Sequence, residues 1–97
     1  MELNIAEVYD DIIVSFSGEI DMLSIKGLKD SLFNLADYHK NVKINFENLD
    51  YLDSTGIGIL LTLNRMVLEN GNNLSLINVP DKIASILRLS SLNSILG

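Results

Sequence analysis

Apolar and polar residues alternate along the chain with two periods, and the changes between them predict the order of the elements. A period of two is clearest at 42–47, where Val42, Ile44 and Phe46 are separated by polar residues, as in a half-buried strand. Similar patterns predict strands at 2–8, 12–17 and 73–79. Apolar residues three or four positions apart predict helices at 24–40, 54–70 and 80–89. The predicted order is ββαβαβα, with right-handed crossovers between parallel strands.

The ends of the predicted helices carry residues that favour such ends. Ser24 and Ser54 are predicted N-cap residues, because a serine hydroxyl accepts a hydrogen bond from a backbone N–H of the first turn. Pro80 suits the start of the third helix. The pair Asn70-Gly71 predicts a left-handed C-cap for the second.

The alternation also predicts the fold class. A strand covered by helices on both faces is apolar throughout, and 42–47 is not. We therefore expect one α/β domain over residues 1–97, with a mixed sheet of four or five strands and helices mainly on one face. The first two strands should form a hairpin, and the tail 90–97 should add a partial turn and a strand stub.

Composition and charge exclude several classes of function. The net charge of −6 disfavours nucleic acid or an anionic membrane surface as a partner, since both require clustered Lys or Arg. The chain has no cysteine and a single histidine, His39, so we expect no disulfide, thiolate chemistry, metal site or cofactor. No apolar run approaches the roughly 18 residues that span a bilayer. The first residues also lack the features of a signal peptide, so we expect a cytoplasmic protein.

The candidate chemistry lies where the strand 42–47 leads into the longest helix. Asp53, Ser54 and Thr55 fall at a helix start, where backbone N–H groups lack intrahelical partners and favour an anion. Gly56 and Gly58 each disfavour a helix by roughly 1 kcal/mol relative to alanine, so their presence in one turn requires a reason. One explanation is tight packing of the helix on the sheet. The other is close approach of another molecule to an exposed Ser54 hydroxyl that accepts a phosphate.

Known phosphate-binding signatures are absent from this segment. Leu61 stands where a dinucleotide-binding loop would have its third glycine, and no P-loop lysine is present. Asp10, Asp11 and Asp53 are spaced somewhat as in a response-regulator receiver. We reject that interpretation, because a hairpin occupies the position of the receiver's first acidic pair.

Two segments resemble one known family. Residues 52–58 read LDSTGIG and follow the strand segment Ile44-Asn45-Phe46, while 18–21 read GEID with Ser24 three residues further on. In this order and spacing they resemble the bacterial anti-sigma factor antagonists, whose domain is called STAS (sulphate transporter and anti-sigma antagonist). The resemblance covers residues 3 to 96. It implies that Ser54, directly after the aspartate, is phosphorylated by a partner kinase.

The resemblance further implies a non-enzymatic switch. The unphosphorylated domain would bind an anti-sigma factor serine/threonine kinase and release a sigma factor or another target, and a PP2C-type phosphatase would reset it. The partner-binding surface would combine the 18–24 loop, including Asp21 and Ser24, with the helix start from Asp53, Ser54 and Thr55 to Gly56 and Gly58. We expect a monomer or a weak dimer.

Two alternatives remain open at this point. A STAS-type module can act as an unphosphorylated scaffold in a larger signalling or transport assembly. A hydrolase with Ser54 as nucleophile is disfavoured, because neither His39 nor a lysine is placed near it to act as the general base.

Overall fold

The computed structural model describes residues 1–89, and its elements follow the predicted order ββαβαβα. The strands are β1 (Glu2–Val8), β2 (Asp11–Ile20), β3 (Asn41–Leu52) and β4 (Leu74–Ile77). The helices are α1 (Met22–Lys26), α2 (Lys29–Asn34), the 3-10 helix η1 (Leu35–Tyr38), α3 (Ser54–Glu69) and α4 (Asp81–Leu87). The strand stub predicted within 90–97 lies outside the described residues.

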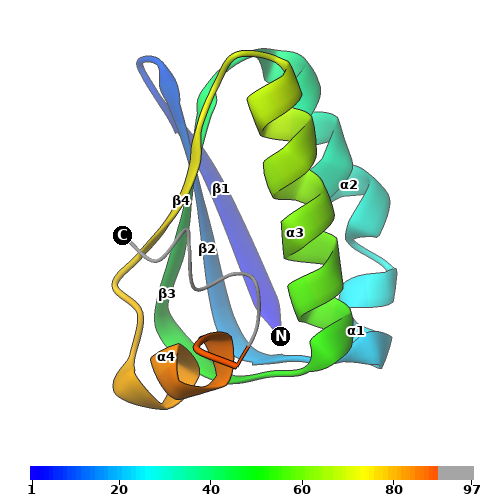
Figure 1. Ribbon diagram of the computed structural model, residues 1–97, viewed down its shortest axis with the longest axis vertical. Coiled ribbons are helices and arrows are strands. Elements are labelled where there is room, and N and C mark those ends of the chain that lie inside the picture. The colour runs from blue at the N-terminus through cyan, green and yellow to red at the C-terminus, as the bar shows by residue number, and fades with distance from the viewer. Residues whose placement is uncertain (90–97) are drawn as a thin grey trace.

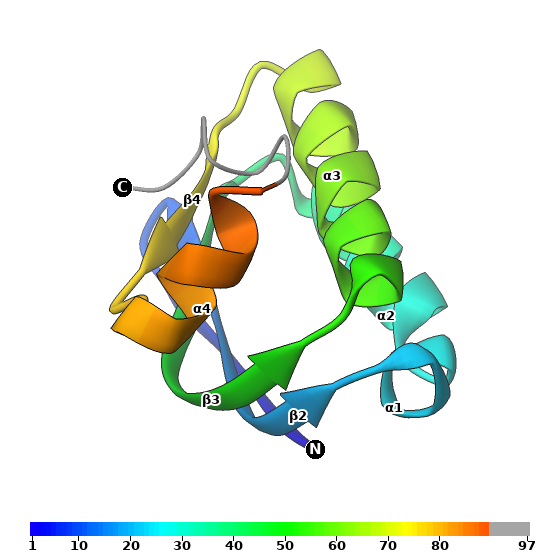
Figure 2. The ribbon, with the colours of Figure 1, turned by 60° about the horizontal axis from the view of Figure 1, so that its bottom comes forward.

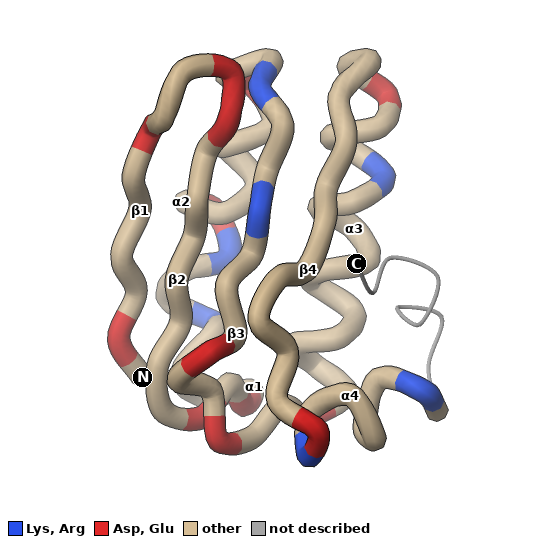
Figure 3. The backbone as a smooth tube through the Cα atoms, turned by 90° about the vertical axis from the view of Figure 1, so that its left-hand side faces the viewer, with Lys and Arg blue, Asp and Glu red and all other residues tan. Residues whose placement is uncertain are grey.

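The four described strands form one mixed sheet in the order β1-β2-β3-β4. β1 and β2 make the predicted antiparallel hairpin, and β3 pairs in parallel with both β2 and β4. The described helices lie on one side of this sheet, and within residues 1–89 no helix covers its other side (Figures 1 and 3). The predicted α/β class with helices mainly on one face is therefore confirmed. Among the described residues, no helix is both long and apolar enough to cross a membrane.

The core lies between the sheet and the helices. The alternate residues Val42, Ile44 and Phe46 are completely buried, as their period of two predicts. The ring of Phe46 packs against that of Phe16 on β2, with 6.1 Å between the ring centroids. From the helices, Leu60 and Leu63 enter this core. Burial of this one face is what holds the helices against the sheet.

β2 and β3 are longer than predicted, and the extra residues position the functional site. β2 continues to Ile20 and β3 to Leu52, beyond register shifts near Ser17 and Glu19. Gly18 has φ of +87° at this irregularity, a conformation that other residues rarely adopt. The strict alternation of period two fails at such shifts, which is why the pattern ended the strands too early.

The single helix predicted at 24–40 is wrong in its details. It consists of α1, α2 and η1, with a break at Gly27. Its first N-cap is Asp21 rather than Ser24. At the other end, His39 adopts a left-handed conformation and ends η1. The predicted C-cap of the long helix is supported by Gly71, whose φ is +80°.

Candidate functional site

Two helix starts lie side by side at the carboxyl ends of β2 and β3. Figure 2 shows β2 leading into α1 and β3 leading into α3, with α1 beside the first turn of α3. The adjacent strand ends are joined by a hydrogen bond of 3.0 Å from the Asp53 backbone N–H to the Ile20 carbonyl oxygen. The predicted juxtaposition of the 18–24 segment with the start of the 54–70 helix is therefore present in the fold.

The carboxylate of Asp53 connects these two helix starts. One carboxylate oxygen, Oδ1, accepts the Gly56 backbone N–H at 3.0 Å, so Asp53 is the N-cap of α3. The other, Oδ2, accepts the backbone N–H of Met22 at 3.1 Å, at the first residue of α1. A single side chain thus satisfies donors from two helices, and the sequence contains no local signal for the second contact.

Asp21 and Ser24 form a capping box at the start of α1. The Asp21 carboxylate accepts the Ser24 backbone N–H at 2.8 Å, and the Ser24 hydroxyl accepts the Asp21 backbone N–H at 2.9 Å. The Ser24 hydroxyl also donates to the carbonyl oxygen of Glu19 or Asp21. The hydrogen bonds of Ser24 therefore all stabilise the start of α1. This favours a structural role for Ser24 over direct contact with a partner.

The capping hydrogen bond perturbs Asp21. The Ser24 backbone N–H, with its hydroxyl contact, holds the pKa of Asp21 below the ordinary value for aspartate. Because the folded-state pKa is lowered, this group stabilises the fold above the ordinary aspartate pKa. That stabilisation is lost as the pH falls through the lowered value.

Asp21→Asn should therefore flatten the acid side of the stability profile. Asparagine keeps an oxygen that can cap α1, yet it does not titrate. Thermal melts between neutral pH and values below the ordinary aspartate pKa should show a shallower loss of stability for the variant than for the wild-type protein. Equal slopes would mean that ionisation of the Asp21 carboxyl does not contribute to the loss of stability in acid.

Ser54 occupies the first residue of α3, not the N-cap position that the sequence predicts. Its side chain is exposed, and its hydroxyl forms no hydrogen bond with the described residues. Thr55 follows and is half-buried. The backbone N–H groups of both residues belong to the first turn, which has no intrahelical acceptors for them. Within the described part of the chain, the site therefore presents a hydroxyl and neighbouring backbone N–H groups that have no hydrogen-bond partner.

The two glycines of this turn have different roles. A Cβ atom at Gly56 would lie 2.6 Å from Ile20 Cγ2 and 2.7 Å from Leu52 Cδ1, both on buried side chains. Gly56 is itself buried, so its missing side chain serves the packing of α3 on the sheet. A Cβ atom at Gly58 would meet nothing within 4 Å, and Gly58 is exposed. The explanation by close approach of another molecule therefore fits Gly58 and not Gly56.

Alanine at these two positions should change stability in opposite directions. Gly56→Ala should lower the free energy of unfolding by about 1–3 kcal/mol, because the buried neighbours must shift to admit the methyl group. Gly58→Ala should raise it by about 0.5–1 kcal/mol, because alanine restricts the unfolded chain and meets no obstacle in the helix. Urea denaturation measures both. A Gly56→Ala protein as stable as the wild type would contradict the packing explanation.

Exposed apolar side chains accompany the polar groups of the site. Met22 is 61% exposed and Leu23 is 83% exposed, both on α1 beside the start of α3. Neither residue belongs to a motif or a periodic pattern that the sequence displays. Only the position of α1 in the fold shows that these two apolar residues lie outside its buried face.

The arrangement offers little for metal binding or serine nucleophile chemistry. Within the described residues, no group of three or more His, Cys, Asp or Glu side chains is placed to hold a metal ion. His39 precedes β3 and Ser54 follows it, so the two lie at opposite ends of a strand that runs from Asn41 to Leu52. The hydrolase alternative therefore finds no histidine base near Ser54 in the described part of the chain.

Similarity to known proteins identifies the family of this chain. The family model of the STAS domain matches residues 2–96, and the chain belongs to this family. It is 28% identical over 96 residues to the anti-sigma-B factor antagonist of Bacillus subtilis (strain 168), covering 99% of this chain and 88% of that protein. The anti-sigma-B factor antagonist of Staphylococcus aureus (strain NCTC 8325 / PS 47) is 27% identical over 99 residues, which cover 99% of this chain and 92% of that protein.

Solved structures show the same fold. The anti-sigma factor antagonist SpoIIAA in its unphosphorylated form superposes with a TM-score of 0.85 at 17% identity, covering 99% of this chain and 86% of that one. The similarity to this structure confirms the fold predicted from the sequence. The relatives matched by sequence are anti-sigma factor antagonists.

Proposed function

We propose that this chain is an anti-sigma factor antagonist that is switched by phosphorylation of Ser54. The observation that carries this proposal is the exposed Ser54 hydroxyl at the first residue of α3, beside an aspartate that already caps the helix. A phosphoryl group can be added there without removing the cap. The adjacent N–H groups at the helix start favour the resulting anion.

The relatives support this role. Two of them bear the name anti-sigma-B factor antagonist, and SpoIIAA has been solved in an unphosphorylated and a phosphorylated form. In our proposal the unphosphorylated chain binds an anti-sigma factor serine/threonine kinase and so releases a sigma factor or another target. The kinase transfers the terminal phosphoryl group of ATP to the Ser54 oxygen, and ADP leaves. A PP2C-type phosphatase hydrolyses the phosphoester and restores the serine.

The proposed partner-binding surface lies around the two helix starts. Met22 and Leu23 supply exposed apolar contact area, and Gly58 leaves space for close approach along α3. Ser54 and Thr55 are the first two residues of α3. Asp21, Ser24, Asp53 and Gly56 act mainly by holding the two helix starts in place. On this account the protein works in the cytoplasm as a binding protein, with no cofactor of its own.

Phosphate mapping tests the acceptor assignment. After incubation with the kinase that co-purifies with the native protein, and ATP, intact mass should show one added phosphoryl group, and peptide mapping should place it on Ser54. Ser54→Ala should remain unmodified, whereas Thr55→Ala should be modified like the wild type. Because Ser54 is not the N-cap, Ser54→Ala should leave stability within about 0.5 kcal/mol of the wild type.

The outcomes distinguish the alternatives. Phosphate on Thr55 in the wild-type protein would overturn the choice of residue. Stable binding of the kinase without any modification would favour a scaffold module over a phosphorylated switch.

A further inference from the structure

The outer edge of β1 is unpaired among the described residues. β1 lies at one end of the sheet and pairs only with β2, from Glu2 opposite Ser17 to Val8 opposite Asp11. In Figure 3 no other described segment covers the outer side of β1. An open strand edge carries backbone donors and acceptors that can pair with another chain.

The register of the hairpin indicates which backbone groups face this open edge. A two-residue turn joins β1 and β2, so the closing pair, Val8 and Asp11, is of the hydrogen-bonded kind. Such pairs alternate with non-hydrogen-bonded pairs along an antiparallel ladder. The N–H and C=O groups of Leu3, Ile5 and Glu7 therefore point away from β2, toward the open edge.

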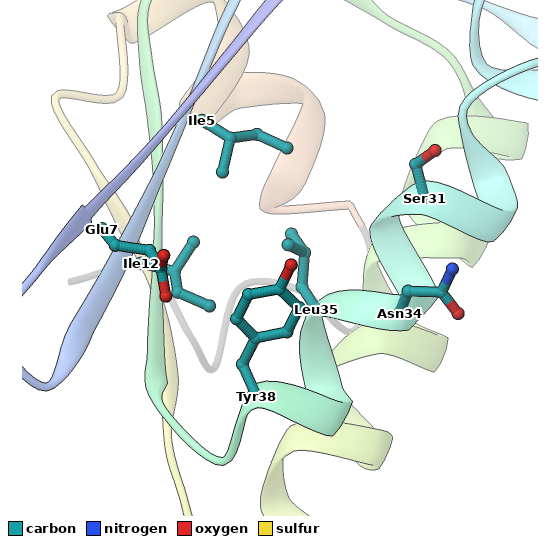
Figure 4. Close-up of a pocket in the computed structure, with 7 residues that line it drawn as sticks. All are labelled: Ile5, Glu7, Ile12, Ser31, Asn34, Leu35 and Tyr38. Atoms are coloured by element: carbon teal, nitrogen blue, oxygen red, sulfur yellow. The ribbon is translucent and has the colours of Figure 1, made fainter.

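A cleft of about 360 Å³ adjoins the same edge on the helix-covered face (Figure 4). Its floor includes the buried side chains of Ile12 and Leu35, yet Ile5 is 41% exposed and Tyr38 is 53% exposed. Exposed aliphatic and aromatic side chains above a buried floor are typical of the centre of a protein interface. At the cleft's rim the charge of Glu7 is matched by Lys40, at 3.1 Å.

We propose that the β1 edge pairs with the β1 edge of a second copy of this chain, antiparallel and centred on Ile5. In this register Ile5 faces Ile5 of the second copy, and Leu3 faces Glu7. All the outward-facing backbone groups of Leu3, Ile5 and Glu7 then find partners. The two sheets join into one, with the helices of both copies on the same side.

The charges along the edge are compatible with this symmetric pairing. Glu2 lies opposite Val8 of the second copy, and Glu7 lies opposite Leu3, so no acidic residue of β1 directly faces another. A copy of the same strand therefore fits this edge, because one symmetric register pairs the outward-facing backbone groups of Leu3, Ile5 and Glu7 and opposes no like charges. Pairing of the two β1 strands also places the α2 helices of the two copies on either side of the paired strands. The second copy then covers the open side of the cleft.

This dimer is weak and is strengthened by salt. Each copy carries a net charge of −6, which opposes association until salt screens it. Pairing through one short strand gives a small interface, so we expect a dissociation constant on the order of 100 μM at physiological ionic strength.

Sedimentation of the full chain with a matched pair of variants tests the proposal. Ile5→Lys places two like charges opposite each other at the centre of the dimer interface and should raise the dissociation constant by about tenfold or more. Leu68→Lys, at a 52% exposed position on α3, should dimerise like the wild type. A wild-type protein that stays monomeric up to about 1 mM would overturn the proposal. So would a dimer that Ile5→Lys leaves intact.

Amide hydrogen exchange provides an independent test at residue level. Protection of the Leu3, Ile5 and Glu7 amides should increase with protein concentration, since their N–H groups are paired only in the dimer. The Asn4 and Ala6 amides face β2 and should be protected at all concentrations. Exchange at Leu3, Ile5 and Glu7 that is independent of concentration would contradict this register.

Discussion

Phosphorylation of Ser54 is expected to weaken binding to the kinase by about a hundredfold, which corresponds to ~3 kcal/mol. The phosphoryl group adds about −1.5 to −2 charges at pH 7, together with its hydration shell. Ser54 is the first residue of α3, one turn before the exposed Gly58, and α1 with its exposed Met22 and Leu23 lies beside this turn. A hydrated dianion at that surface must be desolvated or leaves a gap, and either outcome weakens the contact.

Isothermal titration of the kinase with the unphosphorylated and the phosphorylated protein measures this loss. Ser54→Ala, taken through the same treatment with kinase and ATP, is the matched control and should keep its affinity. Affinity retained by the phosphorylated wild-type protein would contradict the proposed switch.

Asp53→Ala is expected to lower the free energy of unfolding by about 2–4 kcal/mol. The substitution removes the cap on Gly56 and the hydrogen bond to Met22 at the same time. Both bonds are made by a carboxylate, and bonds to charged groups contribute more than neutral ones. For a domain of this size the melting temperature should fall by roughly 4–8 °C for each kcal/mol.

Asp53→Asn separates the loss of the cap from the loss of charge. Asparagine is a good N-cap residue, so this variant should lose markedly less stability than Asp53→Ala in the same denaturation experiment. In Asp53→Ala, the Met22 amide should also exchange faster with solvent. Equal stability of the two variants would contradict the role assigned to the carboxylate.

The architecture could be predicted from the sequence because the sheet is buried on one face only. Val42, Ile44 and Phe46 are buried, and the residues between them, Lys43 and Asn45, lie on the other face. Apolar and polar residues therefore alternate with a period of two in the sequence of this strand. The period of the long helix was equally clear, and its end at Gly71 has a backbone conformation that favours glycine. The resemblance of the LDSTGIG segment to a known family predicted the family to which the chain belongs.

The details of the site could not be read in this way, because they depend on contacts between distant segments. The Asp53 carboxylate reaches Met22, which is 31 positions away. The side chains of Ile20 and Leu52 leave no space for a Cβ atom at position 56. They come close to Gly56 only in the folded protein, where β2 and β3 are paired. Local preference for serine at helix starts pointed to Ser24 and Ser54, whereas aspartates occupy both N-cap positions. Serine and aspartate are nearly equivalent N-caps, so local propensity could not decide between neighbours.

Phosphorylation is expected to act at the surface around Ser54 without reshaping the domain, and amide chemical shifts test this most directly. The first-turn N–H groups attract the phosphate while Asp53 repels it, so the fold has little reason to rearrange. Amide shifts of the unphosphorylated and phosphorylated protein should therefore differ only near residues 21–24 and 53–60. The same two samples should differ in kinase affinity by about a hundredfold. Shift changes spread through β1 to β4 would contradict this account.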